Sequence, residues 1–148
     1  MMTGKHNALR EGVKLGFGVA TSIWIWLALV DAIAGEPFRT FHVLGGIPWF
    51  TVMHYVLNIA YGTGIVAVLN SALRQPSLLG AVTMGFLMIE FGFAMITVLL
   101  SHVGLGELAW LRVFGGSLIG AAVAFMILRR RFPLQAMLRH AEDEEAKA

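Results

Sequence analysis

Four stretches of this sequence are long and apolar enough to cross a lipid bilayer, and this feature restricts the fold more than any other. A helix needs about 20 apolar residues, at about 1.5 Å of rise each, to cross roughly 30 Å of hydrocarbon. The stretches run from about Leu15 to Ala34, Pro48 to Leu69, Leu78 to Ser101 and Leu108 to Leu128. The connections between them are short, so the sequence predicts an antiparallel bundle of four transmembrane helices.

Composition supports the same conclusion. Hydrophobic residues make up 57% of the 148 residues, charged residues only 14%, and the mean hydropathy is +0.74. A soluble domain is about 45–50% apolar with about a quarter of its residues charged, so this chain cannot cover a water-facing surface. We therefore expect an all-α, polytopic integral membrane protein with a single membrane domain over residues 1–148. The absence of cysteine excludes disulfides, thiolate zinc sites and iron–sulfur clusters.

The basic residues predict an orientation. With four spans, both termini and the 70–77 loop share one side of the membrane, and nine of the 11 basic residues fall on that side. The nine are Lys5, Arg10, Lys14, Arg74, Arg129, Arg130, Arg131, Arg139 and Lys147. Only Arg39 and Arg112 fall on the other side. The positive-inside rule then places both termini in the cytoplasm of a bacterial-type inner (plasma) membrane, with a cytoplasmic tail over 129–148.

Two segments of the chain have a second interpretation: the end of the first span and the arginine run after the last span. Ala32, Ile33 and Ala34 match a signal-peptide cleavage site, and cleavage would leave three spans in the same orientation. The full span length of the first stretch and Asp31 beside the site argue against cleavage. The arginine run at 129–131 anchors the last span at anionic lipid headgroups, and no soluble basic module points to nucleic acid.

The first outer loop, residues 35–46, is predicted to form a short interfacial helix. Pro37 suits the first helical position, and the glycines at 45–46 supply a stop. We expect Phe38 and Phe41 to enter the membrane interface while Arg39 and Thr40 face water.

Polar residues within the spans indicate a possible functional seam. Glu90 and Asn58 lie at ~16 Å and ~15 Å from the outer face, and a carboxyl at that depth is protonated unless it is paired or hydrated. Spacings of three and four residues place His54, Asn58 and Tyr61 on one helix face with Thr51. The third span carries a polar stripe that contains Glu90. If the two polar faces meet, they form a protonatable seam between the second and third spans. The alternative is that Glu90 only bonds Asn58 to fix the register of the helices.

A second group of ionisable residues lies toward the outer face. It consists of Asp31, His102, Glu107 and Arg112. Asp31, Glu107 and Arg112 are expected to form a salt-bridge cluster that closes the bundle; alternatively, Arg112 binds a carboxylate or phosphate from the outer side.

Small residues predict close helix packing. Gly116 and Gly120, with Ala124, form a small-xxx-small ridge on the fourth span, and Gly12, Gly16 and Ala20 form another on the first. Packing within the bundle is the simpler interpretation. Homodimerisation or docking to a larger subunit is the alternative.

The sequence predicts no cofactor and no metal site, and it favours a non-enzymatic role over an enzymatic one without deciding between them. Haem b held by two histidines is a minor alternative, but His54 lies ~9 Å deeper than His102. Another is a metal ion near the outer face held by His42, His54, His102 and a carboxylate such as Asp31 or Glu107, although no metal-binding motif supports it.

The leading functional hypothesis is an oligomeric, proton-linked transporter or channel. The alternatives are a non-catalytic accessory or anchor subunit of a larger membrane complex and, less favoured, a haem- or quinone-associated redox subunit. The expected partners are the lipid bilayer and either further copies of the chain or a larger membrane complex.

Overall fold

Three long apolar helices dominate the computed structural model of this chain. The model describes residues 3–72 and 101–130, together with residues 75, 80, 84, 85, 88, 89, 92, 95, 96 and 99. The long helices are α1 (Thr3–Ile33), α3 (Ile47–Ala72) and α5 (Ala109–Arg129). All three are long and apolar enough to cross a membrane. They confirm an all-helical protein and place a helix that could span a membrane at three of the four predicted positions. The span predicted over 78–101, apart from isolated positions, and the tail beyond residue 130 lie outside the described residues.

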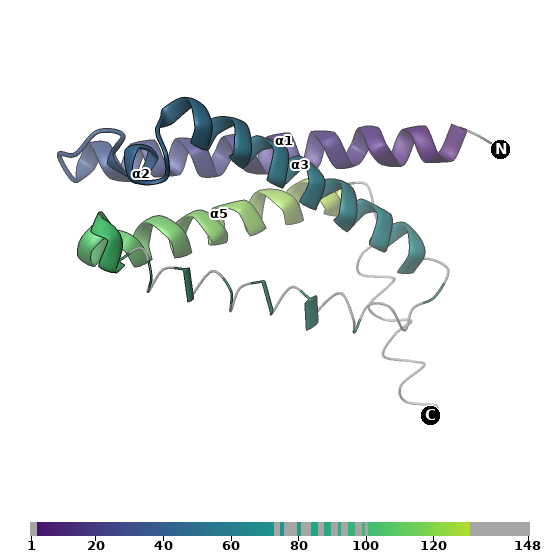
Figure 1. Cartoon of the computed structure of the whole chain (residues 1–148). Coiled ribbons are helices and arrows are strands. Elements are labelled where there is room, and N and C mark those ends of the chain that lie inside the picture. The colour runs from purple at the N-terminus through teal and green to yellow at the C-terminus, as the bar shows by residue number, and fades with distance from the viewer. Residues whose placement is uncertain are drawn as a thin grey trace.

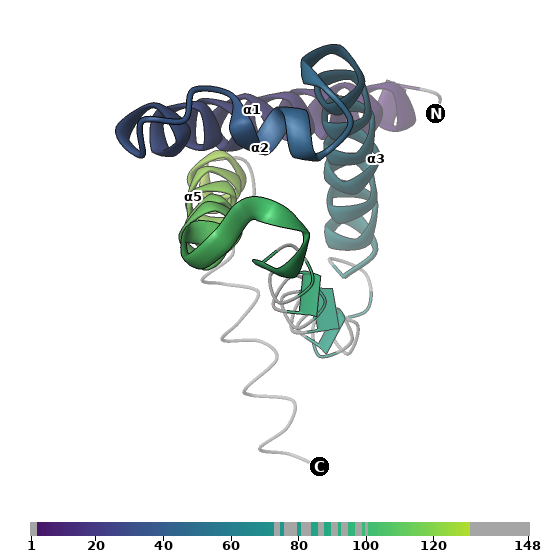
Figure 2. The same ribbon diagram turned by 60° about the vertical axis from the view of Figure 1, so that its left-hand side comes forward.

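Helix α1 is the central element of the described structure. Figures 1 and 2 show that α3 and α5 both pack against α1 and that α3 crosses it, so α1 lies between the contacts made by the other two helices. Leu15 and Val19 of α1 form a buried cluster with Val66 of α3, against which Val123 and Ile127 of α5 also pack. The helix begins at Thr3 rather than near Leu15, because the basic first turns can remain helical outside the hydrocarbon and hydropathy does not detect them.

The α1–α3 crossing is close enough that only glycine fits. A Cβ atom added at Gly16 would lie 2.3 Å from the main-chain oxygen of Asn58, and one at Gly12 would lie 2.5 Å from the Cα of Thr63. On α3, a Cβ at Gly62 would lie 2.6 Å from the main-chain oxygen of Gly12. The backbones therefore touch along this crossing, as small residues allow in membrane helices.

The glycine ridge of α5 packs on the other side of α1. A Cβ at Gly120 would lie 2.8 Å from Ile23 Cδ1, and one at Gly116 would lie 3.3 Å from Ile23 Cγ2. Both glycines are buried. This face is therefore occupied within the chain and is not free to dock a second protein.

Two compact turns close the ends of the long helices that lie away from the N-terminus, and we call this the outer end after the orientation that the sequence predicts. The first contains α2 (Arg39–Val43), and the second contains a π-helical turn, η1 (Ser101–Leu105), followed by a 3₁₀ turn, η2 (Gly106–Leu108). Gly104 has φ 125°, which only glycine adopts readily, and it interrupts the helical backbone before α5.

The first turn differs from its prediction at Thr40. Helix α2 begins at Arg39 instead of Pro37, and Thr40 is buried together with Phe41. The expectation that Thr40 faces water is wrong because its hydroxyl and amide groups bind the buried carboxylate of Asp31.

We predict that Gly62→Ala destabilises the protein by about 1–3 kcal/mol, because the added methyl group meets the backbone of α1. Gly64→Ala is the matched control, since a Cβ at Gly64 meets nothing within 4 Å. Unfolding in detergent micelles by titration with a denaturing detergent measures both variants. Equal free energies of unfolding for the two variants would contradict the close crossing.

Candidate functional site

The first candidate site is built around Asp31 at the outer end of α1. Its side chain is fully buried, at 0% exposure. One carboxylate oxygen accepts a hydrogen bond from the main-chain N–H of Thr40 at 2.8 Å, and the other accepts one from the Thr40 hydroxyl at 2.7 Å. The first N–H groups of a helix lack acceptors within the helix, so Asp31 satisfies a free donor of α2 and lies at the positive end of its dipole.

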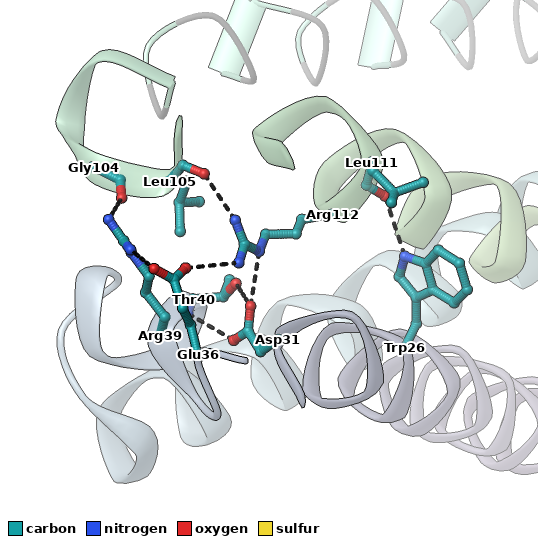
Figure 3. Close-up of polar contacts among 9 residues, drawn as sticks. All are labelled: Trp26, Asp31, Glu36, Arg39, Thr40, Gly104, Leu105, Leu111 and Arg112. Carbon is teal, nitrogen blue, oxygen red and sulfur yellow. Dashed lines mark hydrogen bonds and ion pairs between the residues drawn. The ribbon is translucent and has the colours of Figure 1, made fainter. Parts of the chain in front are cut away.

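Arg112, near the start of α5, is the counter-ion of Asp31. Its side chain is 1% exposed. Nε donates to Asp31 Oδ1 at 2.8 Å, and Nη1 donates to the main-chain oxygen of Leu105 at 2.8 Å (Figure 3). Three segments that are far apart in the sequence therefore meet at one guanidinium group: the end of α1, the turn before α5 and α5 itself.

A second acid–base pair surrounds this core. Glu36 and Arg39, three residues apart in the first outer turn, form an ion pair in which each side chain is about two-fifths exposed. Arg39 Nη2 donates to the main-chain oxygen of Gly104, and Glu36 Oε2 lies 3.6 Å from Arg112 Nη2 (Figure 3). We call Asp31, Glu36, Arg39, Thr40 and Arg112 the outer network.

The outer network neutralises its own charge. Its two carboxylates balance its two guanidinium groups, and Arg39 and Arg112 are the two basic residues that the charge distribution separates from the other nine. Removing one member of a buried ion pair leaves an uncompensated charge and costs about 3–5 kcal/mol. The network therefore ties the two outer turns to each other.

The structure brings together some residues of the predicted outer cluster and not others. Asp31 and Arg112 are in direct contact, whereas His102 and Glu107 are exposed and take no part in the outer network among the described residues. The cluster predicted from the sequence does not include Glu36, Arg39 or Thr40. The three-residue spacing of Glu36 and Arg39 was a signal for their pairing, but no pattern points to Thr40.

The second candidate site is the polar stripe of α3. Its described hydrogen bonds to another helix are made with α1. The indole N–H of Trp24 donates to the Thr51 hydroxyl at 3.1 Å, and His54 Nε2 lies 3.1 Å from the main-chain oxygen of Ala20. Tyr55, which the stripe did not include, shares a hydrogen bond of 2.9 Å with the Thr21 hydroxyl.

The partners of His54 define its tautomer. The carbonyl of Ala20 can only accept, so Nε2 carries the proton and donates to it. Asn58 Nδ2 lies 3.3 Å from His54 Nδ1 and 2.8 Å from the main-chain oxygen of His54, so it donates to both. His54 is therefore held as a neutral imidazole between α1 and Asn58.

Aromatic rings connect the polar stripe to the outer network. Phe50 stacks on His54 with ring centroids 5.2 Å apart, and Phe41 of α2 packs edge-on against Phe50 at 5.0 Å. Trp24 also lies 5.0 Å from Phe41. Phe41 is buried and the other rings are partly buried, so the aromatic cluster packs between α1, α2 and α3.

The other two predicted members of the seam are Glu90 and Tyr61. Glu90 lies outside the described residues. Tyr61 is on α3 and is 37% exposed. The seam between the second and third spans therefore stays a prediction, and the described contacts of Thr51 and His54 with other helices are made with α1.

No three histidine, aspartate or glutamate side chains gather as a possible metal site within the part of the chain that the structure describes. His42 and His102 are both exposed, in the two outer turns. His54 instead uses its ring nitrogens on Ala20 and Asn58.

Comparison with known proteins finds no matching family model, curated protein or solved structure. The functional argument therefore depends on the residues of this chain alone.

Replacing Thr40 by valine tests the environment of Asp31. We expect Thr40→Val to destabilise the protein by about 1–3 kcal/mol, because a buried carboxylate oxygen loses its hydroxyl donor. Thr63→Val is the control, since among the described residues the Thr63 hydroxyl bonds the main-chain oxygen of Ile59 on its own helix and valine keeps the side-chain volume. If both variants unfold at the same denaturant concentration, the Thr40 hydroxyl does not support Asp31.

Proposed function

We propose that this protein is a small proton-linked transporter or channel that spans a bacterial-type inner membrane four times, with both termini in the cytoplasm. The observation that carries the proposal is His54, an ionisable side chain within the apolar helix α3 whose two ring nitrogens are both hydrogen-bonded. Ionisable groups within membrane spans are costly and are typical of proton and ion pathways.

The hydrogen bonds of His54 give this group a way to respond to a proton. In the neutral ring Nδ1 accepts from Asn58 Nδ2. A proton added at Nδ1 turns it into a donor, so the Asn58 amide must rotate to present its oxygen. That rotation breaks the hydrogen bond from Asn58 to the main-chain oxygen of His54. Protonation of His54 is thereby coupled to a rearrangement on α3.

Glu90 is included in the proposal because of its position in the sequence. Its estimated depth of ~16 Å matches that of Asn58, so a carboxyl there is suited to exchange protons with the polar stripe of α3. In this proposal Glu90 is the central proton site and His54 is a relay toward the outer face.

A second candidate is a non-catalytic accessory subunit of a larger membrane complex. It is favoured by one observation, namely that Thr51, His54 and Asn58 all bond to α1 or to their own helix, as residues with a purely structural role do. The α5 glycine ridge packs on α1, so docking in this case would use the apolar side chains exposed on the outer surfaces of the helices.

Proton flux into liposomes containing the purified protein tests the first candidate. We expect Glu90→Gln to lower the flux at least tenfold, since glutamine cannot carry a proton, and His54→Gln to lower it as well. His102→Gln, an exposed histidine in the outer turn, is the control and should behave as the wild type. Unchanged flux in Glu90→Gln would overturn the proposal, and a wild type without flux that co-purifies with a larger protein would favour the accessory subunit.

Cysteine labelling tests the orientation, because the chain has no cysteine of its own. In right-side-out vesicles, a membrane-impermeant maleimide should label His42→Cys and Glu107→Cys, which lie in the two exposed outer turns. Gln75→Cys, beyond the other end of α3, should react only after the vesicles are opened. The reverse pattern would contradict the orientation.

A further inference from the structure

The guanidinium group of Arg112 has one donor that no acceptor satisfies. Nη2 is buried and lacks a hydrogen-bond partner, although Nε and Nη1 each have one at 2.8 Å. Glu36 Oε2 lies 3.6 Å from Nη2, within the range of an ion pair but beyond that of a hydrogen bond. A buried charged donor in this state is unfavourable, so the position is suited to an anion that comes closer.

Glu36 is the group that can leave this position. Its side chain is 40% exposed, whereas Asp31 and Arg112 are at most 1% exposed. It follows Gly35, which has φ 73°, in the connection between α1 and α2. Glu36 contacts both Arg112 Nη2 and Arg39 Nη1. Rotation of its side chain toward solvent would therefore make both of these donors available to another anion.

We propose that Arg39 and Arg112 form a binding site for a phosphate group and that Glu36 occupies it as an internal competitor. Guanidinium groups bind phosphate through paired, charge-assisted hydrogen bonds. With Glu36 displaced, Asp31, Arg39 and Arg112 together carry one net positive charge, which a singly charged phosphodiester neutralises. The two terminal oxygens of a phosphodiester can each accept from one guanidinium group, and a phosphate that is not tethered to the chain can approach Arg112 Nη2 more closely than the 3.6 Å at which Glu36 Oε2 lies.

The position of the site indicates where such a phosphate would come from. Trp110, two residues before Arg112, is 58% exposed, and Trp49, near the start of α3, is 60% exposed. Exposed tryptophans at the ends of apolar helices lie at the level of the lipid headgroups. Lipid phosphates are concentrated at this depth, which favours them in competition with the tethered carboxylate of Glu36. The chemistry is the same for a free phosphate ion.

The test measures phosphate binding to the full chain in an uncharged detergent. The probes are phosphatidylglycerol, uncharged diacylglycerol and inorganic phosphate, with binding followed by native mass spectrometry and by the thermal unfolding midpoint at constant ionic strength. Glu36→Gln removes the competitor, and Glu36→Gln with Arg39→Gln also removes one arginine. Glu107→Gln is the matched control, since it removes the same charge from the same end of the molecule outside the outer network.

We expect Glu36→Gln to bind phosphatidylglycerol about tenfold more tightly than the wild type and Glu107→Gln, and the double variant to lose this gain. If inorganic phosphate binds the wild type and the variants in the same order of affinity, the site accepts phosphate from either source. If only phosphatidylglycerol binds, the site is specific for the lipid headgroup. Equal binding by Glu36→Gln and Glu107→Gln, or an unchanged gain in the double variant, overturns the proposal. If Glu36→Gln does not fold, Arg39→Gln alone must weaken the binding of phosphatidylglycerol by the wild-type chain, and unchanged binding overturns the site.

Discussion

The buried ion pair between Asp31 and Arg112 is the interaction on which the outer half of the structure depends. Neither side chain can reach water, so each charge requires the other. Their pairing, with Thr40 and the carbonyl of Leu105, brings α2 and the turn before α5 onto the end of α1. The rest of the outer network is arranged around this contact.

Further along α1, helix packing depends on small residues and hydrogen bonds instead of charge. Gly16 lets α3 approach until the backbones touch, and Gly120 lets α5 approach the side chain of Ile23. Lipid provides no hydrophobic force between helices, so close packing and polar contacts must hold them. The hydrogen bond from His54 to Ala20 serves this packing and also places an ionisable ring inside the helix pair, which is why a structural and a functional role can coexist there.

The sequence predicts the elements of this fold better than their contacts. Span length and hydropathy are sufficient to locate α3 and α5 to within a few residues, because crossing a bilayer requires a minimum apolar length. Proximity of Asp31 and Arg112 was expected from their shared depth. The role of Thr40 was not, because it depends on how the turn before α2 folds. Periodicity put His54 and Asn58 on one face of a helix, but it cannot say which neighbouring helix that face meets.

A double-mutant cycle on Asp31→Asn and Arg112→Gln tests the central claim most directly. The free energies of unfolding of the wild type, the two single variants and the double variant are measured in the same detergent. We predict a coupling energy of about 3 kcal/mol, because either single change leaves a buried charge alone and the double change removes both. Single effects that add to within about 0.5 kcal/mol would show that the two residues do not interact and would contradict this account.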